Sequence, residues 1–145
     1  MRHVFRQRVY YEDTDAGGVV YHANYLRFAE RARTEALRSL GVPHADMTAL
    51  HGCFFMVRRV KLDYLAPARL DDSLTVTTRA TAVGGASVGL RQSFSAVKPD
   101  AGVRRLAEAE LLLACVRVAD GRPVAIPRRW RVALDSFALG GPEES

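Results

Sequence analysis

The segment from Tyr10 to Leu26, which reads YYEDTDAGGVVYHANYL, concentrates residue types that suit acyl transfer. A strand-like run ends in this segment, a loop rich in carboxylates follows, and a glycine pair leads into the start of a helix-like run. The first turn of a helix carries free N–H groups and a partial positive charge, which stabilise an oxyanion formed during acyl transfer. Asp15, in the loop, would attack a carbonyl docked there or deprotonate a water.

Two further side chains belong to the predicted site. His22, at the start of the helix, would hold a water or polarise the carbonyl, and Tyr11, on the apolar side of the preceding strand, offers a hydroxyl. Each residue also has a structural interpretation. An aspartate before a helix is often a cap or turn residue, a histidine there is often structural, and a buried tyrosine often only satisfies a hydrogen bond. The spacing of these residues leaves both interpretations open.

Five extended runs are predicted as strands because they alternate or are continuously apolar. The last of them also contains strong helix formers, and we predict a strand there because the adjacent hairpins would otherwise lack a central partner. The predicted strands are residues 4–12, 54–64, 73–83, 87–97 and 106–118. Hairpin turns are predicted at Gly84-Gly85 and at 100–102.

One long helix is predicted over residues 23–40, between the first strand and the other four. Asn24 is a plausible N-cap, and Gly41 followed by Pro43 is a stop signal. The order of elements predicts an α+β fold in which an antiparallel sheet of about five strands curls around this helix. The predicted apolar stripe of the helix consists of Tyr25, Phe28, Ala29, Ala32, Ala36 and Leu40.

The length of 145 residues fits one domain, which we place at residues 1–139, followed by a flexible tail at 140–145. No window has the length and hydropathy of a transmembrane helix, and the N-terminus has no apolar secretory region, so we expect a cytoplasmic protein without membrane insertion. Cys53 and Cys115 are expected to be buried small apolar residues. No metal site and no cofactor are expected, because no histidine and cysteine cluster has ligand spacing.

The formal net charge of +5 favours an anionic partner. The basic residues are spread along the chain and do not form a run, which argues against nucleic acid. A phosphorylated small molecule fits as well, because arginine suits phosphate geometry. Charge alone does not choose between these partners.

The stretch YYEDTDAGGVVYHANYLRFAERARTEALRSLG resembles the Tol-Pal-associated (YbgC-type) acyl-CoA thioesterases, of the 4-hydroxybenzoyl-CoA thioesterase group of hot-dog proteins. The resemblance continues in LDYLAPARLDD, at residues 62–72, and more weakly in PVAIP, at residues 123–127. It therefore spans most of the chain and agrees with the predicted order of elements.

The resemblance implies a long central helix wrapped by an antiparallel sheet. It also implies dimers, commonly paired into homotetramers, with active sites at the dimer interface. In this family the second aspartate of the EDTD motif is the catalytic carboxylate, which here is Asp15. The preceding tyrosine and the histidine at the helix start match Tyr11 and His22, whereas Asp13 is interpreted as loop structure. The implied substrate is the thioester of acyl-CoA or of acyl-carrier protein.

Three other functions remain as alternatives. The first is dehydration of hydroxyacyl thioesters, for which Glu30 is available as a helical carboxylate, although the acidic loop fits hydrolysis better. The second is a non-catalytic acyl-thioester or acyl-carrier-protein binding partner in envelope lipid metabolism. The third is nucleic-acid binding, which predicts a steep salt dependence of DNA affinity.

Overall fold

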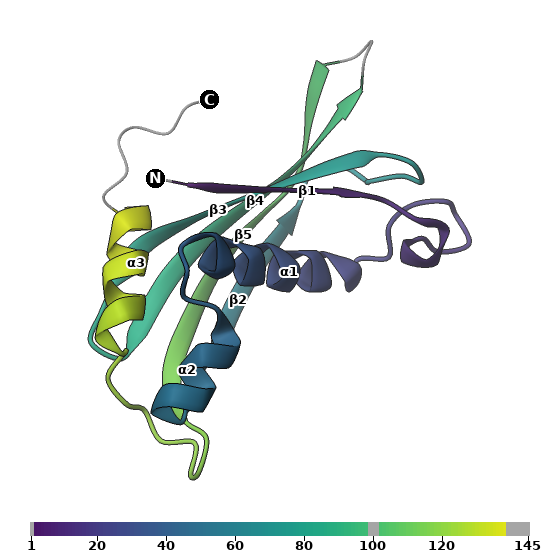
Figure 1. Ribbon diagram of the computed structural model, residues 1–145. Coiled ribbons are helices and arrows are strands. Elements are labelled where there is room, and N and C mark those ends of the chain that lie inside the picture. The colour runs from purple at the N-terminus through teal and green to yellow at the C-terminus, as the bar shows by residue number, and fades with distance from the viewer. Residues whose placement is uncertain (1, 99–101, 139–145) are drawn as a thin grey trace.

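The computed structural model describes residues 2–98 and 102–138. Its strands form one five-stranded antiparallel sheet in the order β1-β3-β4-β5-β2, and α1 lies across one face of this sheet (Figure 1). The predicted α+β architecture, a sheet around one long helix, is confirmed. The elements in chain order are β1 (His3–Arg8), α1 (Asn24–Ser39), α2 (His44–His51), β2 (Cys53–Tyr64), β3 (Ser73–Val83), β4 (Ser87–Lys98), β5 (Gly102–Arg117) and α3 (Arg128–Ala138).

The long helix α1 forms as the apolar spacing predicts, and five of the six residues of its predicted stripe are buried. The exception is Leu40, which lies just beyond the helix, while Leu37 is buried instead. The stop signal is confirmed, because Gly41 adopts a φ of 75° and the N–H of Val42 donates to the carbonyl of Leu37 at 3.1 Å. Such left-handed glycines satisfy the last carbonyls of a helix.

The strands β2 to β5 lie close to their predicted bounds, and the ambiguous last run is a strand throughout. The first strand is shorter than predicted, because β1 ends at Arg8 and a single 3-10 turn occupies Tyr11–Asp13. The hairpin at Gly84-Gly85 is confirmed by a bond of 2.8 Å from the N–H of Gly84 to the carbonyl of Ser87. The predicted tail at 140–145 and most of the predicted turn at 100–102 lie outside the described residues.

Two helices, α2 and α3, were not predicted from the sequence. The signal for α3 was present, because its buried side chains recur at helical spacing. The short helix α2 gave little signal, since only Met47 is buried in it. The helix α3 packs against the sheet beside α1 and closes the core at that end (Figure 1). The residues that give α3 its apolar stripe are Trp130, Ala133, Leu134 and Phe137.

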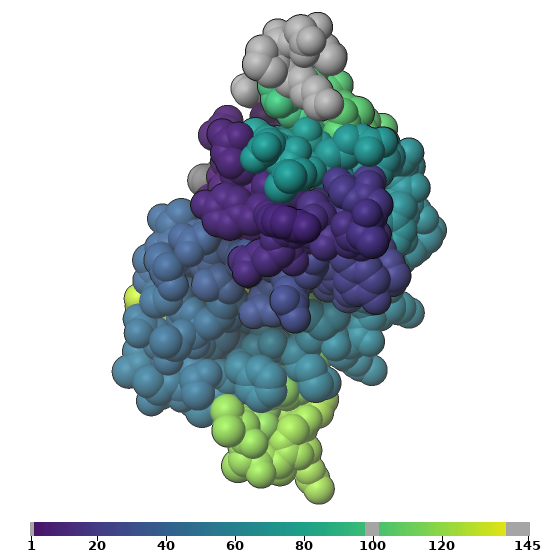
Figure 2. All heavy atoms as spheres, turned by 90° about the vertical axis from the view of Figure 1, so that its right-hand side faces the viewer, coloured from purple at the N-terminus to yellow at the C-terminus, as the bar shows by residue number. Residues whose placement is uncertain are grey.

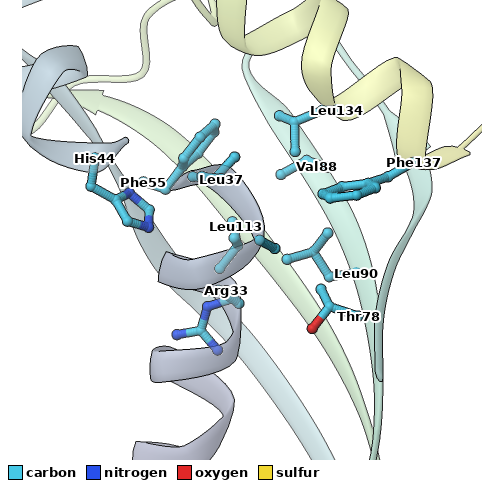
Figure 3. Close-up of a pocket in the computed structure, with 11 residues that line it drawn as sticks. Arg33, Leu37, His44, Phe55, Thr78, Val88, Leu90, Leu113, Leu134 and Phe137 are labelled. Carbon is cyan, nitrogen blue, oxygen red and sulfur yellow. The ribbon is translucent and has the colours of Figure 1, made fainter. Parts of the chain in front are cut away.

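A small cavity of about 20 Å³ remains between α1, α3 and the sheet. Figure 3 shows apolar side chains around it, with Arg33 and His44 on one side. A volume of this size holds about one water molecule, so the cavity is too small for an acyl group.

Both cysteines are buried, as predicted, and neither forms a disulfide in the described part of the chain. Burial, together with a hydrogen bond to Cys53, raises the pKa of Cys115 to about 12. Its thiol therefore stays protonated at neutral pH and does not act as a nucleophile. Among the described residues, no helix is long and apolar enough to span a membrane.

Candidate active site

Asp15 lies in a tight loop between β1 and α1. Its N–H donates to the carbonyl of Val19 at 2.9 Å, and its carbonyl accepts the N–H of Gly18 at 3.1 Å. Its carboxylate accepts the N–H of Gly17 at 2.8 Å. Gly18 has a φ of 77°, which favours glycine, and a Cβ at Gly17 would lie 3.3 Å from the Asp15 Oδ1 atom. The glycine pair thus allows the loop to fold back around the Asp15 carboxylate.

Asp13 ties this loop to the start of α1. Its carbonyl accepts the backbone N–H of Tyr21 at 3.1 Å and the side-chain amide of Asn24 at 2.9 Å. Its carboxylate accepts the N–H of Tyr10 at 2.9 Å. Asp13 is therefore loop structure, as predicted. The prediction that Asn24 is the N-cap is wrong, because Ala23 occupies that position and the Asn24 side chain donates to the loop.

An open cleft of about 330 Å³ lies beside the start of α1. His22, just before the helix as predicted, is exposed on its wall. Figure 2 views the molecule from this end and shows the N-terminal loop segment, in purple, at the surface. The other lining residues come from the loop before α1, from the first turn of α1, and from the end of β2 with the segment that follows it: Val20, Tyr25, Tyr64, Leu65, Ala66 and Pro67.

The backbone N–H groups at the start of α1 are partly used within the turn itself. The N–H groups of Asn24, Tyr25 and Leu26 donate to carbonyls three residues earlier, at 2.9, 3.3 and 3.2 Å. In the described part of the chain, the N–H groups of His22 and Ala23 have no acceptor. These two groups are therefore free to donate to a carbonyl oxygen at the start of α1, where His22 lines the cleft.

The prediction for the environment of Tyr11 is wrong. The strand ends before it, and Tyr11 lies in the 3-10 turn with 82% of its side-chain surface exposed. The cause is the Asp13 carboxylate, which accepts the N–H of Tyr10 and closes the turn. Within one chain, Tyr11 therefore does not offer its hydroxyl from the apolar side of a strand.

The structure brings Asp15 and His22 to the same end of α1 but not into contact. Among the described residues, no hydrogen bond or ring contact joins Asp15 to His22 or to Tyr11. Asp15 is also absent from the lining of the cleft. One chain therefore leaves all three predicted site residues exposed and does not assemble them into a closed pocket.

The segment after β2 holds the wall of the cleft against the Asp15 loop. The carbonyl of Ala68 accepts the N–H of Val20 at 2.8 Å, and the N–H of Ala68 donates to the Tyr25 hydroxyl oxygen at 3.3 Å. Burial raises the pKa of Tyr25, so its hydroxyl stays protonated. The loop that carries Asp15, the helix and this segment are thus joined into one hydrogen-bonded unit.

A buried ion pair fixes the far end of the same segment. The Asp72 carboxylate, which is almost fully buried, accepts from the Arg104 guanidinium at 2.8 Å and from the N–H of Arg69 at 2.9 Å. Arg104 comes from β5, so the pair ties the segment to the sheet. Sequence reasoning missed Tyr25, Tyr64 and this pair, although the motif at residues 62–72 was a signal that the segment matters.

Comparison with known proteins gives consistent results. Residues 17–101 match the family model described as "Thioesterase superfamily". The chain is 42% identical over 130 residues to an acyl-CoA thioesterase, YbgC, of Haemophilus influenzae, which covers 90% of this chain and 92% of the relative. It is 46% identical over 123 residues to an acyl-CoA thioester hydrolase, YbgC, of Escherichia coli O6:H1, which covers 83% of this chain and 87% of the relative.

The fold has a close counterpart among solved structures. The structure of 4-hydroxybenzoyl-CoA thioesterase from Pseudomonas sp. strain CBS-3 superposes with a TM-score of 0.84 at 20% identity. It covers 91% of this chain and 98% of that chain. At this identity the likeness shows the fold alone, which is the hot-dog fold.

Proposed function

Since the chain belongs to the thioesterase superfamily and is an acyl-CoA thioester hydrolase, we propose that Asp15 is the carboxylate that cleaves its substrate. The observation that carries this proposal is the position of Asp15. It lies in a loop that is hydrogen-bonded to the start of α1, where the N–H groups of His22 and Ala23 lack acceptors among the described residues. Release of free thiol from a panel of acyl-CoA substrates measures the activity and its acyl preference.

The thioester carbonyl accepts hydrogen bonds from these N–H groups, which stabilise the oxyanion as it forms. In one route the Asp15 carboxylate attacks the carbonyl carbon, the carbon–sulfur bond breaks, and water then hydrolyses the acyl anhydride. In the other, Asp15 takes a proton from water as the water oxygen attacks the same carbon. The CoA thiolate is a good leaving group, so little acid assistance is needed in either route. After it leaves, it takes up a proton that derives from the attacking water.

His22→Ala should reduce turnover less than removal of the Asp15 carboxylate. The backbone N–H of residue 22 survives the deletion of the side chain, whereas no backbone group replaces a carboxylate. Steady-state turnover of the two variants, measured side by side with one acyl-CoA, checks this order. If His22→Ala were as damaging as Asp15→Asn, the histidine would be a principal base and the assignment of roles would be reversed.

Turnover should persist after exhaustive treatment with a chelator, because the proposed steps use a carboxylate, backbone dipoles and water only. The support is that no group of three or more potential ligands lies together in the part of the chain that the structure describes. Turnover is measured before and after chelation, with a zinc hydrolase as the positive control for chelation. Inactivation that is reversed by adding a metal ion would contradict the metal-free mechanism.

The proposal includes a homodimer that pairs through β2. This strand forms one edge of the sheet over twelve residues, and β5 is its only neighbour among the strands that the structure describes. Val57 and Val60 pair with the buried Leu113 and Leu111, yet they remain 40% and 38% exposed. Residues opposite each other in a ladder share one face of the sheet, so these valines lie on the core side without cover. Long uncovered edges with apolar side chains are typical of association sites.

A second copy at β2 would also complete the active site. Within one chain the cleft is open and Asp15 is not in its lining. The strand β2 ends at Tyr64, which lies in the cleft wall, so a partner paired along β2 comes close to this cleft. Symmetric pairing of one strand with its own copy is usual in homodimers. Pairing of two dimers into a tetramer stays a prediction. Sedimentation at assay concentration distinguishes a dimer from a tetramer.

The proposed compartment is the cytoplasm. The support is that Cys53 and Cys115 are both free and buried, which suits a reducing environment. The proposed partners are the acyl-CoA or acyl-carrier-protein thioester and a second copy of the chain.

A further inference from the structure

We propose that Tyr64 is a positioning residue for hydrolysis, because its hydroxyl holds the peptide that carries one of the two proposed oxyanion donors, the N–H of Ala23. The inference rests on the proposed function and deepens it. The Tyr64 hydroxyl donates to the carbonyl of His22 at 3.0 Å, across 42 positions of sequence. This carbonyl belongs to the peptide whose N–H is that of Ala23, one of the two donors without an acceptor.

Tyr64 is itself held firmly on two sides. Its backbone pairs with Ala107 of β5, and the N–H of the next residue, Leu65, donates to the carbonyl of Leu106 at 2.8 Å. Its ring packs edge to face against the buried Tyr25, with 5.3 Å between the ring centroids. The sheet and the helix therefore fix the hydroxyl, and the hydroxyl in turn fixes the residue just before α1.

The bond has a specific effect on the donors. The peptide unit is planar and trans, so fixing its carbonyl also fixes the N–H of Ala23 on the opposite side. A hydrogen bond donated to a peptide carbonyl polarises the unit and strengthens its N–H as a donor. From the other described residues, the carbonyl of His22 accepts only the long bond of 3.3 Å from the N–H of Tyr25. Burial raises the pKa of Tyr64, so its hydroxyl keeps the proton that it donates.

Tyr64→Phe should lower kcat about three- to tenfold with little change in KM, because it removes one hydrogen bond and keeps the ring. An interaction used only in the transition state lowers kcat and kcat/KM equally. Tyr21→Phe is the matched control. The Tyr21 ring lies 4.5 Å from that of His22, and among the described residues its hydroxyl makes no hydrogen bond. We expect Tyr21→Phe to keep the kcat of the unaltered protein.

Inhibition by two substrate analogues separates positioning from a general structural effect. A ketone analogue, in which a methylene replaces the thioester sulfur, keeps the carbonyl that the N–H groups would bind. A thioether analogue lacks this carbonyl. Tyr64→Phe should weaken inhibition by the ketone and leave inhibition by the thioether unchanged, at an unchanged melting temperature. A merely structural role would weaken both analogues together.

Three results would overturn the positioning role: an unchanged kcat in Tyr64→Phe, a raised KM at constant kcat, or equal weakening of both analogues. A raised KM would mean that Tyr64 contacts the substrate instead. The proposed function fails separately, since it depends on the Asp15 carboxylate. Loss of turnover in Asp15→Asn, together with full turnover in Tyr64→Phe, would support the proposed function and refute only the positioning role of Tyr64.

Discussion

Asp15→Asn is expected to lower the turnover of acyl-CoA by at least about 100-fold while the protein stays folded. The amide neither attacks a thioester nor accepts a proton from water at neutral pH, so both proposed routes lose their central group. The loop should survive, because an amide oxygen can still accept the N–H of Gly17, which the carboxylate accepts at 2.8 Å. Turnover, circular dichroism and melting temperature are measured together.

Glu12→Gln provides the matched control for this experiment. Glu12 is an exposed carboxylate three residues earlier in the same acidic segment, and among the described residues it makes no hydrogen bond or ion pair. Its neutralisation changes the charge by the same amount, so we expect near-normal turnover. Near-normal turnover in folded Asp15→Asn would refute the assignment of Asp15.

Water labelled with heavy oxygen distinguishes a nucleophilic Asp15 from an Asp15 that acts as a general base. If an anhydride forms, water can attack it at the aspartyl carbonyl and place heavy oxygen in the Asp15 side chain over many turnovers. Mass spectrometry of the peptide that contains Asp15 detects this label. A base that only removes a proton from water gains no label, so the appearance of label identifies the nucleophilic route.

The double variant Val57→Lys/Val60→Lys is expected to sediment as a monomer and to lose most of its turnover, at least about tenfold. Each copy would bring two ammonium groups to the edge of β2, and pairing would bury them without partners. The active site depends on the second copy in the proposed arrangement, so turnover should fall with the oligomeric state. Sedimentation and turnover are compared at the same protein concentration.

Val132→Lys on α3 is the control for this change. Val132 is 59% exposed and lies away from β2, so a lysine there should change neither sedimentation nor turnover. A folded double variant that is monomeric and fully active would contradict the shared active site. A double variant that still associates would show that the interface lies elsewhere.

Short-range patterns in the sequence were enough to predict the long helix, most of the strands and the segment in which the proposed chemistry lies. The spacing of apolar residues located α1, and alternating or continuously apolar runs located four of the five strands to within a few residues. These features depend on neighbours three, four or two positions apart, which a sequence displays directly. Asp15 and His22 could be named together because both lie in one short segment around a strand end and a helix start.

Hydrogen bonds between side chains and the backbone were harder to predict from the sequence. Alternation predicted that the first strand continues to Glu12, and it would have placed Tyr11 on the apolar side. The Asp13 carboxylate instead accepts the N–H of Tyr10 and turns the chain. Asn24 likewise donates to the carbonyl of Asp13 and leaves the N-cap position to Ala23. Aspartate and asparagine can serve several local bonds, and only the folded loop selects among them.

The order of strands in the sheet was decided by the tertiary structure alone. β2 and β3 follow each other in the sequence, yet they lie at opposite sides of the sheet, because β2 pairs with β5 and β3 pairs with β1 and β4. After Tyr64, this crossover carries the chain past the start of α1. The hydroxyl of Tyr64 therefore reaches the carbonyl of His22. Strand pairing depends on contacts between residues far apart in the chain, and these leave no period in the sequence. The acidic loop could therefore be recognised before the fold was known, whereas the cleft wall that faces it could not.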